Sequence, residues 1–387
     1  MKKAIILGNY GVGNLGDEDM LSRVISLVNA KGYSSVVCCG SPKKVSTIGI
    51  EVCRFLPSGL RSLIKWLWSK AYRTSIEVTK KQFNSSQTII FGGGGLFVDT
   101  HWSAILLWWI HLRYAVKSKK HIVMLSQTFS ISKRLSAFLC IPLLKKVALI
   151  AVRDRASQNL LKTFGIASQY LPDITFMREP EGKHPQILKK SVVLSLCKWG
   201  VDKQQREALV SVVKNLSVQG YTLIGTIFQS RHDNDYLVYQ QLGVPMRLIT
   251  HHHEILEAIQ SADLLIGMRY HAIAMAIRCA TPFVALMYQP KVANLLSDMD
   301  LLEQGIAIRK VNQELLQLKV NQTLITMIQS GGTCAQSALN CGNEPKATPP
   351  WSFKYSTCSR ENASHQHTKV AGLFKGKESA AKNCEPG

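Results

Sequence analysis

Arg269 and His271 lie between an apolar run, residues 264–267, and an apolar helical segment, residues 272–280. An arginine offers a fixed fork of donors for a carboxylate or phosphate, and a histidine can move a proton near neutral pH. A strand followed by a helix would place both side chains at the carboxyl end of the strand, where α/β sheets bind ligands. The pattern predicts an anion site with a proton-transfer group. A structural histidine is the alternative, and the neighbouring arginine favours the functional interpretation.

Further basic residues follow other predicted strands. Lys291 closes the segment Tyr288-Gln289-Pro290-Lys291, after the apolar run 283–286, and would bring a second positive charge to the same edge of the sheet. Arg153 begins Arg153-Asp154-Arg155, which is either a capped, salt-bridged helix start or part of the wall of a cleft. The run His251-His252-His253 is not expected to bind a metal, because consecutive helical residues cannot converge on one ion.

Two glycine-rich segments are candidate ligand loops. One is Gly11-Val12-Gly13-Asn14-Leu15-Gly16, and the other is Gly92-Gly93-Gly94-Gly95, directly after the apolar run 88–91. Glycines let backbone N–H groups approach an anion, although a tight turn is the alternative for the second segment. A dinucleotide site is not expected, because the predicted strand 36–39 ends without an acid. Asp17 opens the helix after the first segment, where it could cap free N–H groups.

These candidates need strands and helices to position them, and the chain supplies two similar blocks of both. Apolar strand patterns occur at residues 4–7, 36–39, 88–91, 122–125, 192–196, 221–227, 264–267 and 283–286, with helical patterns between them. Such alternation predicts an α/β fold with parallel, doubly wound sheets. We therefore predict two Rossmann-like domains facing a cleft, residues 1–185 and 186–330. Residues 331–387 lack apolar periodicity and are predicted to form a disordered tail.

The composition limits the class of protein. The chain has 387 residues, of which 46% are hydrophobic, and this excludes a wholly disordered or fibrous protein. Its 47 Lys and Arg against 25 Asp and Glu give a net charge of +22, which attracts phosphates, nucleic acid or anionic membranes. No nucleic-acid-binding motif appears, so we expect no nucleic-acid partner. Without a signal-peptide core, a membrane-spanning run or a CxxC pair, we expect a cytoplasmic protein with reduced thiols and no metal site.

Residues 55–70 combine leucines, an isoleucine and two tryptophans with three basic residues in a helix-compatible pattern. One interpretation is an amphipathic helix whose apolar side chains pack inside the N-terminal domain while the basic ones face water. The other is an interfacial helix that binds an anionic membrane reversibly. The nearby Trp102, Trp108 and Trp109 and the excess of positive charge favour the second. We expect peripheral contact with the inner face of a membrane.

In order along the chain, these segments resemble the polysaccharide pyruvyl transferase family. The resemblance rests on Gly8-Asn9-Tyr10-Gly11, Asn14-Leu15-Gly16-Asp17-Glu18, Gly92 to Gly95 with Leu96 and Asp99, Val152 to Ser157, Leu171-Pro172-Asp173, Gly267 to His271, and Tyr288 to Val292. It covers roughly residues 4 to 325 and leaves out the tail. It implies a fold like that of GT-B glycosyltransferases and the transfer of pyruvate from phosphoenolpyruvate, without a metal or cofactor.

The resemblance also implies a role for each candidate residue. Arg269 and Lys291 would hold the donor's carboxylate and phosphate in the cleft, and His271 would be the general acid or base. The acceptor, a sugar or lipid-linked oligosaccharide, would gain a pyruvate ketal across two hydroxyls. Further substrate-binding positions are Asn14, Gly16, Asp17, Gly93, Gly94, Gly95, Asp99, Arg153 and Lys198.

Two segments differ from the family pattern. Relatives usually carry an arginine two residues before the tryptophan that matches Trp199, whereas this chain has Cys197-Lys198-Trp199, in which Lys198 would be an imperfect substitute. The segment 126–131 keeps the glutamine of the family but not its glycines. Because of these differences, a non-catalytic paralogue is one alternative function. A nucleotide-sugar glycosyltransferase of the same architecture is another, since the glycine-rich segments alone do not exclude it.

Overall fold

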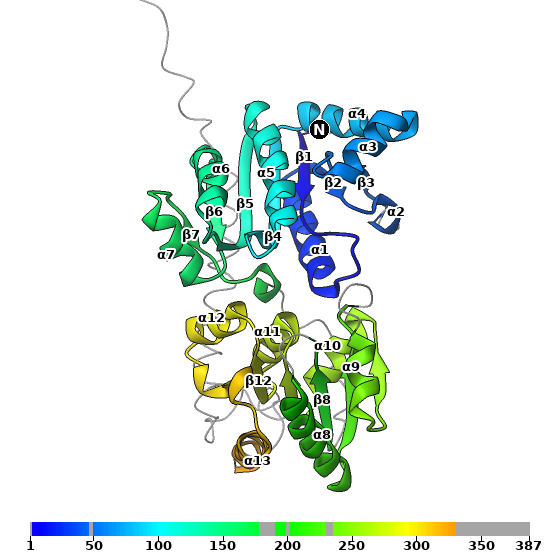
Figure 1. Ribbon diagram of the computed structural model, residues 1–387, viewed down its shortest axis with the longest axis vertical. Coiled ribbons are helices and arrows are strands. Elements are labelled where there is room, and N and C mark those ends of the chain that lie inside the picture. The colour runs from blue at the N-terminus through cyan, green and yellow to red at the C-terminus, as the bar shows by residue number, and fades with distance from the viewer. Residues whose placement is uncertain (1, 46–48, 178–189, 199–201, 230–234, 330–387) are drawn as a thin grey trace, which may run out of the picture. The chain divides into compact units, whose positions relative to one another are not determined.

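The computed structural model describes residues 2–45, 49–177, 190–198, 202–229 and 235–329 (Figure 1). These residues form two compact units. The first contains the chain up to Gly11 and from Met20 to Met177, and the second contains Val12–Asp19 and the described residues from 190 onward. The predicted domain boundary at 185 and the predicted tail, residues 331–387, lie outside the described residues.

The first unit is built on a seven-stranded parallel sheet with the order β3-β2-β1-β4-β5-β6-β7. Its strands are β1 (Lys2–Leu7), β2 (Tyr33–Cys39), β3 (Glu51–Arg54), β4 (Thr88–Val98), β5 (His121–Ser130), β6 (Leu149–Val152) and β7 (Gln169–Tyr170). Ile5 and Leu7 belong to one hydrophobic cluster and Ala4 and Ile6 to another, so both faces of β1 are covered. This two-sided burial explains why the strands read as continuous apolar runs.

Helices connect these strands (Figure 1). They are α1 (Leu15–Ala30), α2 (Pro42–Val45), α3 (Leu60–Trp68), α4 (Lys70–Ser85), α5 (Trp102–Lys117), α6 (Arg134–Leu144), α7 (Arg155–Thr163) and the short 3-10 helix η2 (Ile174–Met177). Local chemistry sets several helix starts. The Ser69 hydroxyl accepts the Tyr72 N–H at the start of α4, and the Asp154 carboxylate accepts the Ser157 N–H at the start of α7.

The glycine run is part of a strand. We expected Gly92 to Gly95 to form a loop, and this prediction is wrong, because β4 continues through them and pairs with β5 as far as Val98. The reason is tertiary: pairing with β5 continues past the glycines, with an irregular register between Gly94 and Phe97, and the positive φ values of Gly93 and Gly94 accompany this irregularity.

The second unit has a six-stranded parallel sheet with the order β10-β9-β8-β11-β12-β13. Its strands are β8 (Ser191–Ser195), β9 (Thr222–Thr226), β10 (Arg247–Ile249), β11 (Leu264–Gly267), β12 (Phe283–Met287) and β13 (Gly305–Ala307). Its helices are α8 (Lys203–Val218), α9 (Asp235–Leu242), α10 (His252–Ser261), α11 (Tyr270–Cys279), α12 (Pro290–Asp298) and α13 (Gln313–Gln329), with 3-10 helices η3 (Leu302–Gln304) and η4 (Ile308–Lys310).

Each sheet reverses its direction of winding once, between β1 and β4 in the first unit and between β8 and β11 in the second. These are the topological switch points where doubly wound folds bind ligands, beyond the carboxyl ends of the strands. The prediction of two doubly wound, Rossmann-like units is confirmed. Among the helices described here, none is long and apolar enough to cross a membrane.

Candidate active site

Arg269 lies at the switch point of the second sheet. It is the residue before the first turn of α11, and its backbone N–H and that of Met268 both donate to the Ser195 carbonyl at the end of β8, at 3.3 and 2.7 Å. The apolar residues of α11, from Ala272 to Ile277, are buried and anchor the helix against the sheet. The backbone that carries Arg269 is therefore fixed to both strands of the switch point.

Asp235 holds the side chain of Arg269. This carboxylate, fully buried at the start of α9, forms an ion pair with the guanidinium and accepts backbone N–H groups of Phe228 and Gln229, each at 3.0 Å. Burial acts to lower the pKa of Arg269, but the charge and hydrogen bond of Asp235, together with Cys197 and Tyr288, outweigh it, and the pKa is raised. Arg269 is thus a permanent cation whose direction is set by a neighbouring element.

Sequence reasoning missed Asp235. The residue lies 34 positions before Arg269, at the end of the polar run Arg231-His232-Asp233-Asn234-Asp235, and no local pattern distinguishes it from a solvated acid. One signal was available: Asp235 follows β9, whose carboxyl end lies at the same edge of a parallel sheet as that of β11. Polar residues after each strand of a doubly wound sheet are candidates for one site.

His271 lies in the first turn of α11, close to the backbone of Gly16. A Cβ added at Gly16 would lie 1.9 Å from Nδ1 of the histidine, so only glycine fits there. The ring of Tyr270 contacts His271 edge to face, with centroids 5.3 Å apart. The structure therefore brings two residues from distant parts of the sequence, Gly16 and His271, into direct contact.

The segment around Gly16 is held by the same backbone that holds Asp235. Asn14 forms an antiparallel bridge with Gln229, and the Leu15 N–H donates to the Phe228 carbonyl at 3.2 Å. The Asn14 side chain donates to Asp17 at 2.8 Å and accepts the Gly16 N–H at 3.2 Å. Asn14, Gly16 and Asp17, all candidates from the sequence, are thus placed beside the Arg269 and His271 helix.

Lys198 and Lys291 follow the two strands that flank β11. Gly267 of β11 is opposite Ser195 of β8 and Ala285 of β12, so both lysines emerge at the carboxyl edge of the sheet. The side chain of Lys198 is exposed, and Lys291 is the second residue of α12, after Pro290. Cys197 directly precedes Lys198, and Tyr288 lies three residues before Lys291. Both side chains act to raise the pKa of Arg269.

The glycines of β4 have close neighbours in their own unit. The Tyr10 hydroxyl donates to the Gly92 carbonyl at 2.7 Å, and a Cβ at Gly92 would lie 2.5 Å from that hydroxyl. Gly93 has a φ of +60°, and a Cβ there would lie 2.5 Å from the sulfur of Met20. These contacts give a structural reason for Gly92 and Gly93. The binding role of Gly93, Gly94 and Gly95 stays a prediction.

Asp99 and Arg153 make dense contacts inside the first unit. Asp99 accepts the N–H groups of Ser132 and Lys133, at 2.8 and 2.7 Å, and the Ser132 hydroxyl at 2.9 Å. Burial acts to raise its pKa, but these hydrogen bonds outweigh it, and the pKa is lowered. Arg153 forms a buried ion pair with Asp173 at 2.7 Å and donates to Thr128 at 2.8 Å. These contacts agree with the interpretation of Arg153-Asp154-Arg155 as a salt-bridged helix start.

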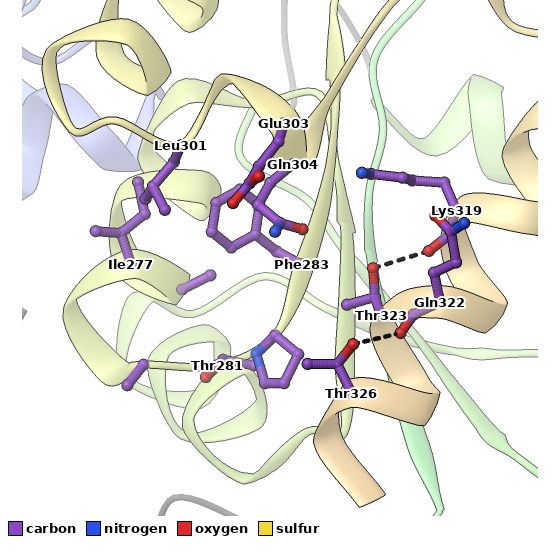
Figure 2. A pocket seen from close by; sticks show the side chains of 13 residues that line it. Ile277, Thr281, Phe283, Leu301, Glu303, Gln304, Lys319, Gln322, Thr323 and Thr326 are labelled. Atoms are coloured by element: carbon purple, nitrogen blue, oxygen red, sulfur yellow. Dashed lines mark hydrogen bonds between the residues drawn. The ribbon is translucent and has the colours of Figure 1, made fainter. Parts of the chain in front are cut away.

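A cavity of about 380 Å³ lies elsewhere in the second unit, between the end of α11, the start of β12 and α13 (Figure 2). Thr323 and Thr326 of α13 face it, and their hydroxyls donate to the carbonyls of Lys319 and Gln322 (Figure 2). Because it contains the amino end of β12, this cavity lies at the opposite edge of the sheet from Arg269. In the described part of the chain, no group of three acids, histidines or cysteines could hold a metal.

Solved structures with this fold include enzymes that act on nucleotide sugars. A glycosyltransferase from Rickettsia africae ESF-5 has a TM-score of 0.58 at 11% identity, over 97% of this chain and 99% of that one. The UDP-GlcNAc 2-epimerase from Methanocaldococcus jannaschii has a TM-score of 0.55 at 13% identity, over 84% and 93%. Anabaena Alr3699/HepE, in complex with UDP and glucose, has a TM-score of 0.52 at 15% identity, over 96% and 97%. At these identities the similarity establishes the fold, which is that of the GT-B glycosyltransferases.

The family is defined by sequence. The model of the polysaccharide pyruvyl transferase family matches residues 14–290, well over half of the chain. The chain therefore belongs to the polysaccharide pyruvyl transferase family and is a transferase. The match includes Asp235, Arg269 and His271 and ends one residue before Lys291. A comparison with curated proteins finds no match.

Proposed function

We propose that the chain transfers the pyruvyl group of phosphoenolpyruvate to two hydroxyls of a sugar, forming a ketal and releasing phosphate. The observation that carries this proposal is the pairing of a fixed cation, Arg269 on Asp235, with His271 two residues later, in the first turn of α11. Phosphoenolpyruvate is a small, multiply charged anion, and such ligands need donors with fixed directions. Family membership supports the same reaction class.

The donor site consists of Arg269 and Lys291, with Lys198 as a third cation. The guanidinium binds the donor carboxylate through its fork, and the ammonium groups neutralise the phosphate. Lys291 also lies in the first turn of α12, where the helix dipole adds to the attraction for an anion. The three positive charges come from the ends of adjacent strands, which supports a single binding site for all of them.

His271 moves the proton. In the reaction a proton is added to the methylene carbon of the donor, and a sugar hydroxyl bonds to the adjacent carbon and gives up its own proton, which balances the one added. The bond from that carbon to the phosphate oxygen then breaks. The second hydroxyl then bonds to the same carbon, and its proton leaves with the phosphate. Phosphoenolpyruvate and a diol thus give the ketal and inorganic phosphate. We assign the carbon protonation or the hydroxyl deprotonation to His271 as general acid or base.

The acceptor binds beside His271, against Asn14, Gly16 and Asp17. Support comes from the close approach of Gly16 to the imidazole and from the Asn14 and Asp17 side chains next to it. We propose that the acceptor is a cell-surface polysaccharide or its lipid-linked precursor, and that the protein acts in the cytoplasm.

A nucleotide-sugar glycosyltransferase is the second candidate function. It is favoured by one observation, the shared fold with a protein whose structure contains UDP and glucose. The two functions differ in the donor, so the donor decides between them. Family membership favours phosphoenolpyruvate.

Phosphate release tests the proposal. The full chain is incubated with phosphoenolpyruvate and a set of lipid-linked sugars, and in parallel with UDP-glucose and the same acceptors. We expect acceptor-dependent release of phosphate in the first series and no acceptor-dependent release of UDP in the second. His271→Gln should still bind the donor but lose on the order of 10² to 10⁴ in turnover. Transfer from UDP-glucose alone would identify a glycosyltransferase instead.

A further inference from the structure

The apolar stripe of α3 faces outward. Leu60, Leu63, Ile64, Leu67 and Trp68 are 74, 48, 47, 53 and 85% exposed, and no residue of α3 is buried. Their spacing places all five on one side of the helix. Trp66 and Ser62 occupy the other side and are only partly exposed. This orientation excludes the interpretation in which the leucines pack inside the unit and the basic residues alone face water.

Positive charge surrounds this stripe. Arg61 and Lys65 are exposed one turn apart on α3, and Lys70 opens α4. Between residues 54 and 85 the chain has one acid, Glu77, and seven basic residues: Arg54, Arg61, Lys65, Lys70, Arg73, Lys80 and Lys81. Glu77 already pairs with Lys80 at 2.7 Å. An apolar face bordered by unbalanced basic residues is the composition of helices that lie in the interface of an anionic membrane.

The helix is held in place without using its apolar face. The Ser62 hydroxyl accepts the N–H groups of Ser58 and Gly59, both at 3.0 Å, which fixes the start of α3. At its other end the Arg73 guanidinium donates to the Leu67 carbonyl at 2.9 Å. A helix of nine residues is marginal by itself, so these contacts explain its order. They leave the five apolar side chains available for a partner.

We propose that α3 docks the protein reversibly on an anionic lipid surface, with the Leu60 to Trp68 stripe in the headgroup region and Arg61, Lys65 and Lys70 on lipid phosphates. Electrostatic repulsion argues against a second copy of the chain as the partner of this stripe. A two-fold contact through α3 would place Arg61 and Lys65 of one copy close to the same residues of the other. Lipid phosphates complement the same charges. The proposal does not depend on the proposed reaction.

Vesicle flotation with the full chain tests this proposal. The vesicles are phosphatidylcholine alone or an equimolar mixture with phosphatidylglycerol, each at low and high salt. We expect binding to the anionic vesicles at low salt and weaker binding at high salt. Leu63→Glu with Leu67→Glu should abolish binding, and Arg61→Glu and Lys65→Glu should each weaken it by at least about fivefold.

Two matched substitutions control for charge alone. Val218 is an isolated apolar residue on α8, 86% exposed, and Lys214 is an exposed lysine of the same helix. Val218→Glu and Lys214→Glu should leave vesicle binding unchanged. The proposal is overturned if the parent chain does not float with anionic vesicles at low salt, or if the controls lose binding as much as the α3 variants. It is also overturned if the parent dimerises through α3, so that Leu63→Glu converts a dimer to a monomer without any vesicle binding.

Discussion

At the scale of single residues, Asp235 does more than neutralise a partly buried arginine. Its two oxygens have different partners, the guanidinium of Arg269 on one and the backbone N–H groups of Phe228 and Gln229 on the other. The same two residues, Phe228 and Gln229, also pair with Asn14 and Leu15. One carboxylate thereby links the donor cation to the segment proposed to bind the acceptor. We infer that Asp235 is a positioning residue.

Asp235→Asn tests this role. The amide keeps the size of the side chain and can still accept backbone N–H groups, but the charge that orients Arg269 is lost. We expect kcat/KM for phosphoenolpyruvate to fall by roughly ten- to a hundredfold, because hydrogen bonds between charged groups contribute about 1.5 to 3 kcal/mol. Asp263→Asn is the control, a buried acid that accepts the Ser191 N–H at 2.9 Å at the opposite edge of the sheet. Equal kinetics for Asp235→Asn and the parent would refute the role.

Gly16→Ala tests the contact with His271. A methyl group at this position would overlap the imidazole, so the ring or the segment must move. We expect a loss of turnover that exceeds any loss of thermal stability. Gly40→Ala is the matched control, because a Cβ there meets its nearest atom, on Phe55, at an ordinary 3.4 Å. If both variants keep the turnover of the parent, His271 tolerates displacement and is not the proton-transfer group.

At the scale of elements, β11 and α11 could be predicted almost to the residue, because an apolar run followed by polar residues and an apolar helix is a local pattern. Contacts between residues far apart in the sequence could not be predicted in this way. β4 extends through four glycines because β5 pairs with it, and Asp235 reaches Arg269 across the end of β8. For α3 the periodicity predicted an apolar stripe, but it did not predict whether the stripe faces the core of the unit or the solvent. Only tertiary structure shows that Trp66, rather than the leucines, faces the unit.

His111 of α5 should make the first unit sensitive to acid. Its Nε2 accepts the Leu56 N–H at 2.9 Å, and its Nδ1 lies 2.7 Å from the Leu107 carbonyl, so the ring must be neutral. Burial lowers its pKa from 6.5 to about 4. The unfolded chain therefore binds a proton that the folded chain does not between these pH values. This contribution to stability is present above pH 6.5 and is lost as the pH falls towards 4.

The size of this loss can be measured. We expect the free energy of unfolding in urea to decrease by roughly 3 kcal/mol from this residue alone between the two pKa values. His111→Gln, whose amide oxygen can accept the Leu56 N–H, should flatten that part of the pH profile. His101→Gln is the control, since His101 is exposed at the start of α5. An unchanged pH profile in His111→Gln would show that His111 is not the group that titrates.

At the scale of the whole molecule, we propose two distinct uses for positive charge. One set of cations, Arg269, Lys291 and Lys198, lies at the carboxyl edge of the second sheet, and the other lies on α3 and α4 in the first unit. A net charge of +22 alone could not separate a small-anion site from a membrane surface. Burial distinguishes the two sets of cations. Arg269 is partly buried and paired with Asp235, whereas Arg61 and Lys65 are exposed beside an apolar stripe.

Calorimetric titration of the full chain with phosphoenolpyruvate tests the proposed donor site most directly, with the parent and Arg269→Ala compared at the same ionic strength. We expect the parent to bind phosphoenolpyruvate and Arg269→Ala to bind it at least roughly tenfold more weakly, since a charged hydrogen-bond partner is lost. We also expect that UDP-glucose does not compete. Equal affinity in the two proteins, or displacement of phosphoenolpyruvate by UDP-glucose from the parent, would contradict the assignment of this site to an enolpyruvyl donor.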